Sequence, residues 1–237
     1  MPESTGIKQR WNDIKTRVNN SVIGCGRQPT DINIIAVSKT YPVDLILEGI
    51  DAGIRLFGEN YVQELKDKHD FLNSKQILQP EWHFIGHLQR NKVKYIAPFI
   101  SMIHSVDTFQ LAQEISEEAL KNERIIDILL QANTSGEESK FGCEPDKIFN
   151  LYESIMPFKN INVKGLMTIG SFTNDKELIL REFRLLRSLK DKINVKFGIK
   201  LEHLSMGMTG DFELAITEGA TYVRIGTAIF GERNYKQ

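Results

Sequence analysis

Short runs of apolar and β-branched residues recur along the chain, each followed by polar or glycine-containing positions. Runs of this length, bounded by turn-forming residues, are typical of buried β-strands. Eight of them predict strands, at Ile32–Val37, Ile54–Phe57, Trp82–Gly86, Met102–Val106, Ile125–Ala132, Val163–Thr168, Glu202–Ser205 and Thr221–Ile225.

The stretches between these runs carry apolar residues at three- and four-residue spacing, with charged residues on the other side, as in amphipathic helices. The clearest predict helices over Gly6–Cys25, Glu59–Asn73, Thr108–Lys121 and Asp175–Ile193. In the last of these helices the apolar stripe comprises Leu178, Leu180, Phe183, Leu185, Leu186 and Leu189. Residues 173–175, Thr-Asn-Asp, can cap its start.

Strands that alternate with helices pair in parallel, because each crossover helix returns the chain to the same edge of the sheet. Eight such units predict an α/β fold, a single (β/α)8 TIM-type barrel with an extra N-terminal helix. An open, doubly wound sheet is the alternative. No linker or low-complexity segment divides the chain, so residues 1–237 are expected to form one domain.

Composition narrows the classes of function. The formal net charge is -1, from 30 basic and 31 acidic side chains, which argues against general nucleic-acid binding. The two cysteines, Cys25 and Cys143, are too few for a disulfide framework and suit free thiols in a reducing cytoplasm. No apolar run approaches the ~20 residues that a membrane span needs. We therefore expect a cytoplasmic protein, and a monomer, since no apolar patch is evident.

The active site of such a barrel lies in the loops that follow the strands. Lys39 follows the first strand, and period-two alternation places it on the same face as Ile35 and Val37. If this face points inward, burial lowers the lysine pKa, and the neutral amine can attack an aldehyde to form an imine. The alternative is a strand-end lysine whose ammonium reaches solvent.

The loops after the last two predicted strands suit an anion. Glycines and hydroxyls at Ser205, Gly207, Gly226 and Thr227 can surround a phosphate, and barrels often bind phosphate between these two loops. Arg224 precedes the second loop. Because arginine only donates, a pyridine nitrogen facing it would stay unprotonated. The alternatives are ordinary turn glycines and a structural ion pair of Arg224 with Glu59 or Asp211.

Several segments together resemble the pyridoxal phosphate homeostasis proteins, whose barrel is similar to the N-terminal half of alanine racemase. The resemblance covers residues 6–233. Its blocks are Ala36–Thr40, Phe57–Glu64, Trp82–Gln89, His104–Asp107, Asn133–Lys140, Gly165–Gly170, Leu204–Met208 and Val223–Gly231. The block at residues 133–140 contains Lys140, which resembles a second lysine of interest in the family. The block at residues 204–208 contains Met206.

The resemblance implies that pyridoxal 5′-phosphate (PLP) is the cofactor and that Lys39 is its lysine. It implies Ser205, Gly226 and Thr227 as phosphate ligands and Arg224 beside the ring nitrogen. It also implies that Asn60 and Met167 line the cofactor, and that Met206 and Gly207 belong to the phosphate loop that contains Ser205.

Three functions remain open at this stage. The first is a PLP-binding protein of vitamin B6 homeostasis that holds PLP as a Schiff base without substantial turnover and passes it to apo-enzymes. The second is a PLP enzyme such as an amino-acid racemase, which needs proton donors on both faces of the substrate carbon. Only Tyr235 lies in the short tail to supply one. The third is an aldolase or isomerase without PLP. His83 and His87 suit core and capping roles better than a metal pair.

Overall fold

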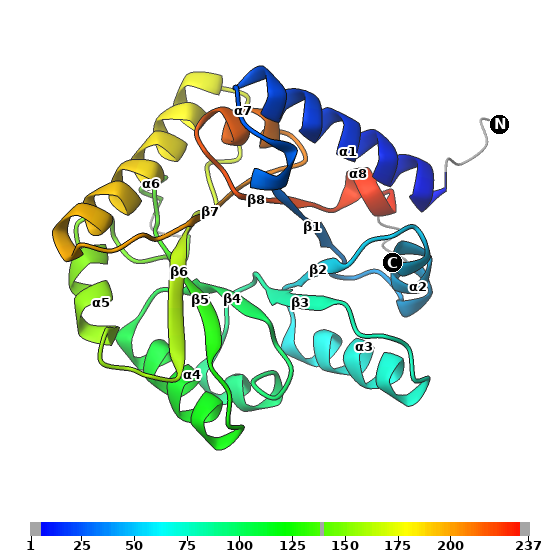
Figure 1. Cartoon of the computed structure of the whole chain (residues 1–237), viewed down its shortest axis with the longest axis horizontal. Coiled ribbons are helices and arrows are strands. Elements are labelled where there is room, and N and C mark those ends of the chain that lie inside the picture. The colour runs from blue at the N-terminus through cyan, green and yellow to red at the C-terminus, as the bar shows by residue number, and fades with distance from the viewer. Residues whose placement is uncertain (1–5, 138–139, 233–237) are drawn as a thin grey trace.

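Eight parallel strands close into a barrel in sequence order in the computed structural model, which describes residues 6–137 and 140–232 (Figure 1). The strands are β1 (Asn33–Val37), β2 (Leu56–Glu59), β3 (Glu81–Phe84), β4 (Met102–Val106), β5 (Ile126–Gln131), β6 (Ile161–Met167), β7 (His203–Met208) and β8 (Tyr222–Ile225). The barrel closes where β8 pairs with β1, with Ile35 opposite Arg224. This closure confirms the predicted barrel over the open sheet.

Helices surround the strands, as Figure 1 shows. They are α1 (Ile7–Gly24), α2 (Val43–Asp51), α3 (Val62–Ser74), α4 (Phe109–Lys121), α5 (Ile148–Ile155), α6 (Lys176–Phe197), α7 (Phe212–Thr217) and α8 (Thr227–Phe230), with 3-10 turns at Pro29–Asp31 and Arg90–Tyr95. The predicted extra N-terminal helix is confirmed as α1, which lies outside β8 and β1 (Figure 1). Among the described residues, no helix is both long and apolar enough to cross a membrane.

Two predicted features of the helices were wrong in detail. The helix expected from Glu59 begins at Val62, because Glu59 is the last residue of β2 and is fully buried. In α6 the buried face contains Ile179 and Ile193, whereas Leu178 and Leu180 are only half-buried. The predicted cap is confirmed, since the Asp175 side chain accepts hydrogen bonds from the backbone N–H groups of residues 177 and 178.

The core has two layers because successive side chains of a strand point to opposite faces. The outer layer, between strands and helices, contains most of the buried apolar residues, such as Ala36, Phe57 and Trp82. The inner layer fills the barrel and consists of Ile35, Val37, Ile85, Met102, Leu129, Met167 and Tyr222. Ile35 and Val37 therefore face inward, as the alternation in β1 predicts.

Candidate functional site

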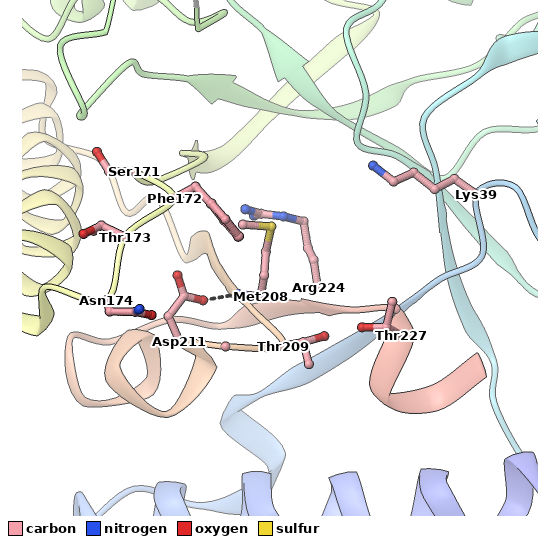
Figure 2. Close-up of a pocket in the computed structure, with 12 residues that line it drawn as sticks. Lys39, Ser171, Phe172, Thr173, Asn174, Met208, Thr209, Asp211, Arg224 and Thr227 are labelled. Atoms are coloured by element: carbon pink, nitrogen blue, oxygen red, sulfur yellow. Dashed lines mark hydrogen bonds between the residues drawn. The ribbon is translucent and has the colours of Figure 1, made fainter. Parts of the chain in front are cut away.

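Lys39 continues the inward-facing register of β1 by one step. Its side chain is half-buried and lines a cavity of about 450 Å³. In Figure 2 it extends from the end of β1 toward the space that Arg224 enters from β8. Lys39 thus lies at the barrel mouth, on the face that the alternation in β1 predicts.

A buried ionic network fixes the backbone on either side of Lys39. Glu59 Oε1 accepts hydrogen bonds from Ser38 Oγ and from Lys68 Nζ, both at 2.6 Å. Lys68 Nζ also donates to the Ser38 carbonyl at 2.8 Å. Burial raises the pKa of Glu59, although the nearby Lys68 lowers it. On the other side of Lys39, Thr40 has a left-handed backbone, φ 66°, and its N–H donates to Glu64 at 2.6 Å.

The cavity lies at the carboxyl ends of the strands, where loops following β1, β6, β7 and β8 meet. Its lining residues are Lys39, Ser171, Phe172, Thr173, Asn174, Met208, Thr209, Gly210, Asp211, Arg224, Gly226 and Thr227 (Figure 2). The volume falls in the range of ordinary small-molecule sites, roughly 300 to 1,000 Å³. Both a nucleophilic amine and a guanidinium therefore reach one ligand-sized space.

Arg224 carries a buried positive charge that pairs with no carboxylate in residues 6–137 and 140–232. Neither predicted ion pair forms, since Glu59 pairs with Lys68 and Asp211 accepts from the backbone N–H of Met208. Arg224 donates instead to Ser205 Oγ at 2.7 Å and to the Thr168 carbonyl at 2.8 Å. Burial lowers the pKa of Arg224 to about 10, so the side chain stays charged at neutral pH. Asp211 attracts this charge without bonding to it, so a buried guanidinium with only neutral hydrogen-bond partners favours an electron-rich ligand beside it.

The two predicted phosphate loops meet at the cavity. Gly226 and Thr227 begin α8, where backbone N–H groups have no acceptor in their own helix. Gly226 approaches β1 so closely that an added Cβ would lie 3.2 Å from the Val37 carbonyl. Thr209 and Gly210 face them from the other loop. Gly207 enables that loop, because its φ of 89° suits glycine.

Other predicted residues do not line the cavity. Ser205 and Met167 are fully buried, with Met167 in the inner core. Met206 packs in the outer core, so any contact it makes with a ligand comes from its backbone. Asn60 lines a separate hollow with Tyr61 and His87, and its Oδ1 is buried without a hydrogen-bond partner.

Sequence reasoning missed some lining residues and one buried histidine. Of the lining residues after β6, Thr173 and Asn174 were predicted only as part of a helix cap, and Ser171 and Phe172 were given no role, although their position after a strand is itself a signal. His104 was not assigned a role. Its inward direction could have been predicted, since it alternates with Met102 in β4.

The remaining candidates lie as follows. His83 is buried in the barrel, and His87 stacks on Phe141 with ring centroids 3.8 Å apart. No cluster of metal-binding side chains occurs in the portion of the chain that is described. Lys140 pairs with Glu137 at 2.7 Å and donates to the Gly170 carbonyl at 3.1 Å. Tyr235 lies outside the described residues.

Comparison with known proteins identifies the family of this chain. Residues 20–234 match the family model described as the N-terminal domain of alanine racemase. A pyridoxal phosphate homeostasis protein of Aquifex aeolicus is 42% identical over 227 residues, covering 96% of this chain and 98% of that protein. The chain belongs to the family of pyridoxal phosphate homeostasis proteins.

Solved structures separate this family from its distant relatives. PipY of Synechococcus elongatus, solved with PLP bound, is 30% identical, with a TM-score of 0.83 over 95% of this chain and all of its own. An alanine racemase of Clostridium difficile shares only the fold. Its TM-score is 0.71 at 15% identity, over 94% of this chain and 58% of that one.

Proposed function

We propose that this protein binds PLP in the cavity at the barrel mouth, linked to Lys39, and thereby keeps the vitamin B6 supply steady. The observation that carries the proposal is the entry of Lys39 and Arg224 into one cavity from the adjacent strands β1 and β8 (Figure 2). The name of the Aquifex relative and the PLP bound to PipY support the same ligand.

The residues present fit each part of PLP. Lys39 offers an amine to the aldehyde, where loss of one water leaves a C=N bond. Thr227, Thr209 and the turn at Gly226 offer hydroxyl and N–H donors to the phosphate. Ser205, Met206, Gly207 and Met167, in the strands and the core behind these groups, remain predicted neighbours of the cofactor, as does Asn60, which lines a separate hollow.

Arg224 suits a carrier better than an enzyme. A guanidinium has no acceptor, so it leaves the pyridine nitrogen of PLP unprotonated. An unprotonated ring withdraws electrons weakly, unlike the ring in enzymes that pair the nitrogen with an acid. We therefore expect no substantial turnover of amino acids.

The proposal extends to the partners, the oligomeric state and the compartment of the protein. A carrier delivers PLP to apo forms of PLP-dependent enzymes, which we take as its partners. We keep the predicted monomer, and we keep the cytoplasm as the compartment because both cysteines are unpaired.

Borohydride reduction followed by peptide mass spectrometry tests the linkage. The expected result is the mass of reduced PLP on Lys39, with a visible absorption band before reduction that Lys39→Ala loses. Lys140 serves as an internal comparison, since its ammonium is committed to Glu137 and Gly170. A label on Lys140 alone, or no visible band after incubation with PLP, overturns the proposal. Robust racemisation by the purified protein would instead support the racemase.

A further inference from the structure

A chain of buried polar side chains crosses the barrel interior behind the cavity. It joins Arg224 of β8 to Ser205 of β7, then to His104 of β4 and His83 of β3. The successive distances are 2.7 Å from Arg224 Nη1 to Ser205 Oγ, 3.0 Å from Ser205 Oγ to His104 Nδ1, and 2.9 Å from His104 Nε2 to His83 Nδ1. All four side chains are buried, with exposures of 5% or less.

One direction of these hydrogen bonds gives every donor in the chain an acceptor, including the Ser205 proton. Arginine cannot accept a hydrogen bond, so Ser205 Oγ accepts from Arg224. The single Ser205 proton then points to His104 Nδ1, the remaining partner of that oxygen. His104 must therefore carry its proton on Nε2 and donate it to His83 Nδ1. Each member donates to the next, beginning at the guanidinium.

The surroundings keep both histidines neutral, as this direction requires. Burial lowers the pKa of His83 to about 3 and that of His104 well below its usual range. The charge of Arg224 lowers the pKa of His104 further. A neutral imidazole has one acceptor and one donor nitrogen, which is the pair that this chain uses.

We propose that His104, oriented by His83, is a positioning residue that fixes the guanidinium of Arg224 at the cofactor site. By accepting a hydrogen bond from Ser205 Oγ, His104 turns a lone pair of that oxygen toward Arg224 Nη1. The Thr168 carbonyl holds Nη2, and the two contacts set the plane of the guanidinium. This inference rests on the proposed function only in taking the PLP ring as the group that Arg224 faces. The contacts from Arg224 to His83 need no ligand.

Replacing His104 removes the acceptor and tests the proposal. In His104→Leu the Ser205 proton has no acceptor in the chain, so Arg224 loses its fixed position. We expect the visible band of bound PLP to shift toward that of Arg224→Gln. We also expect PLP affinity to fall about tenfold or more, the low end of what a lost hydrogen bond to a charged group costs. His104→Asn, which retains an acceptor near the Nδ1 position, should restore the wild-type band.

His203 supplies a matched control. Its ring also packs against Tyr222, with centroids 4.8 Å apart compared with 5.5 Å for His104. However, His203 Nδ1 bonds to Thr221 Oγ1 and not to the chain. His203→Gln should leave the band unchanged. In an Arg224→Gln background, His104→Leu should produce no further spectral shift.

Nitrogen NMR of the PLP-free protein provides a second test that needs neither cofactor nor variants. Protonation of His104 on Nε2 alone at neutral pH supports the proposal, and a proton on Nδ1 overturns it. The proposal is also overturned if His104→Leu at saturating PLP has the same visible absorption band as the wild-type protein. Absence of any band in the wild-type protein would refute the proposed function while leaving the NMR result intact.

Discussion

At the scale of single residues, Arg224 combines burial, full charge and the lack of a carboxylate partner within the described ranges. Its hydrogen bonds go to a hydroxyl and a carbonyl, and Asp211 attracts its charge without forming an ion pair. Such a site favours an electron-rich ligand atom, and the ring nitrogen of PLP is one. The protonation state of that nitrogen therefore depends on the residue at this position.

Reversal of the charge at this position should be visible in the spectrum. In Arg224→Glu a carboxylate faces the ring nitrogen and stabilises its protonated form, because opposite charges attract. We expect the absorption band of bound PLP to shift relative to the wild type, whereas Arg224→Lys, which keeps a donor and a charge, should shift it less. Absorbance at saturating PLP measures both. Identical spectra for the Glu and wild-type proteins would contradict contact between Arg224 and the ring.

Single residues also mark what the sequence could predict. The inward direction of Lys39 follows from alternation within one strand, a local property of the sequence. The bond between His104 and Ser205 joins residues 101 positions apart in different strands. No local pattern encodes that pairing, because it depends on the register around the whole barrel.

At the scale of elements, the end of β7 and the loop that leads from it to α7 depend on close packing. A Cβ at Gly207 would lie 2.5 Å from Ala215 Cβ and 3.0 Å from Phe212 Cα, both in α7. The positive φ of 89° at this position also disfavours any other residue. The same loop contributes Met208, Thr209 and Gly210 to the cavity wall. Its shape thus couples the packing of α7 to the site.

Gly207→Ala should therefore damage both stability and binding. We expect a loss of about 2 kcal/mol or more in the free energy of unfolding, from backbone strain and overpacking together. Gly210→Ala, in the same loop, is the stability control, since an added Cβ there meets nothing within 4 Å. Urea unfolding of both variants measures the difference. Equal stability of the two would show that α7 moves away at little cost.

The number of strands was predicted, and β4 has the predicted bounds, Met102–Val106, whereas the bounds of other elements differ. The eight strands follow from apolar runs, whereas Glu59 looked like a helical residue because its charge suits an exposed face. In the structure it ends β2 and pairs with Lys68 beneath Lys39. A buried ion pair between elements is a tertiary feature, and it overrides the local pattern.

At the scale of the whole molecule, the barrel brings the ends of its strands to one mouth and encloses polar groups that titrate abnormally. His83 and His104 stay neutral inside it, while they would titrate near their usual pKa of about 6.5 in an unfolded chain. Burial also raises the pKa of Glu59, which has the opposite effect on stability at lower pH. The stability of the protein is therefore linked to pH through its interior.

The sign of this linkage follows from proton counting. Below pH 6.5 the unfolded chain binds protons on these histidines and the folded protein does not, so acid favours unfolding. For each histidine the loss approaches about 1.4 kcal/mol per pH unit, and for His83 it continues down to a pH of about 3. Glu59 acts in reverse, because burial raises its pKa and the folded protein takes up its proton before the unfolded chain does.

Histidines of the unfolded chain take up protons in the window between pH 6.5 and 5.5, and a comparison of variants within it assigns the effect to one residue. The PLP-free wild-type protein should lose stability on acidification through this window, as measured by urea unfolding at several pH values. His104→Asn removes one titrating group, so its stability should fall less steeply, by up to about 1.4 kcal/mol per pH unit. Parallel pH dependence in the two proteins would mean that His104 is already protonated or solvated in the folded state. The direction of the hydrogen bonds from Arg224 through the barrel would then have to be reversed or broken.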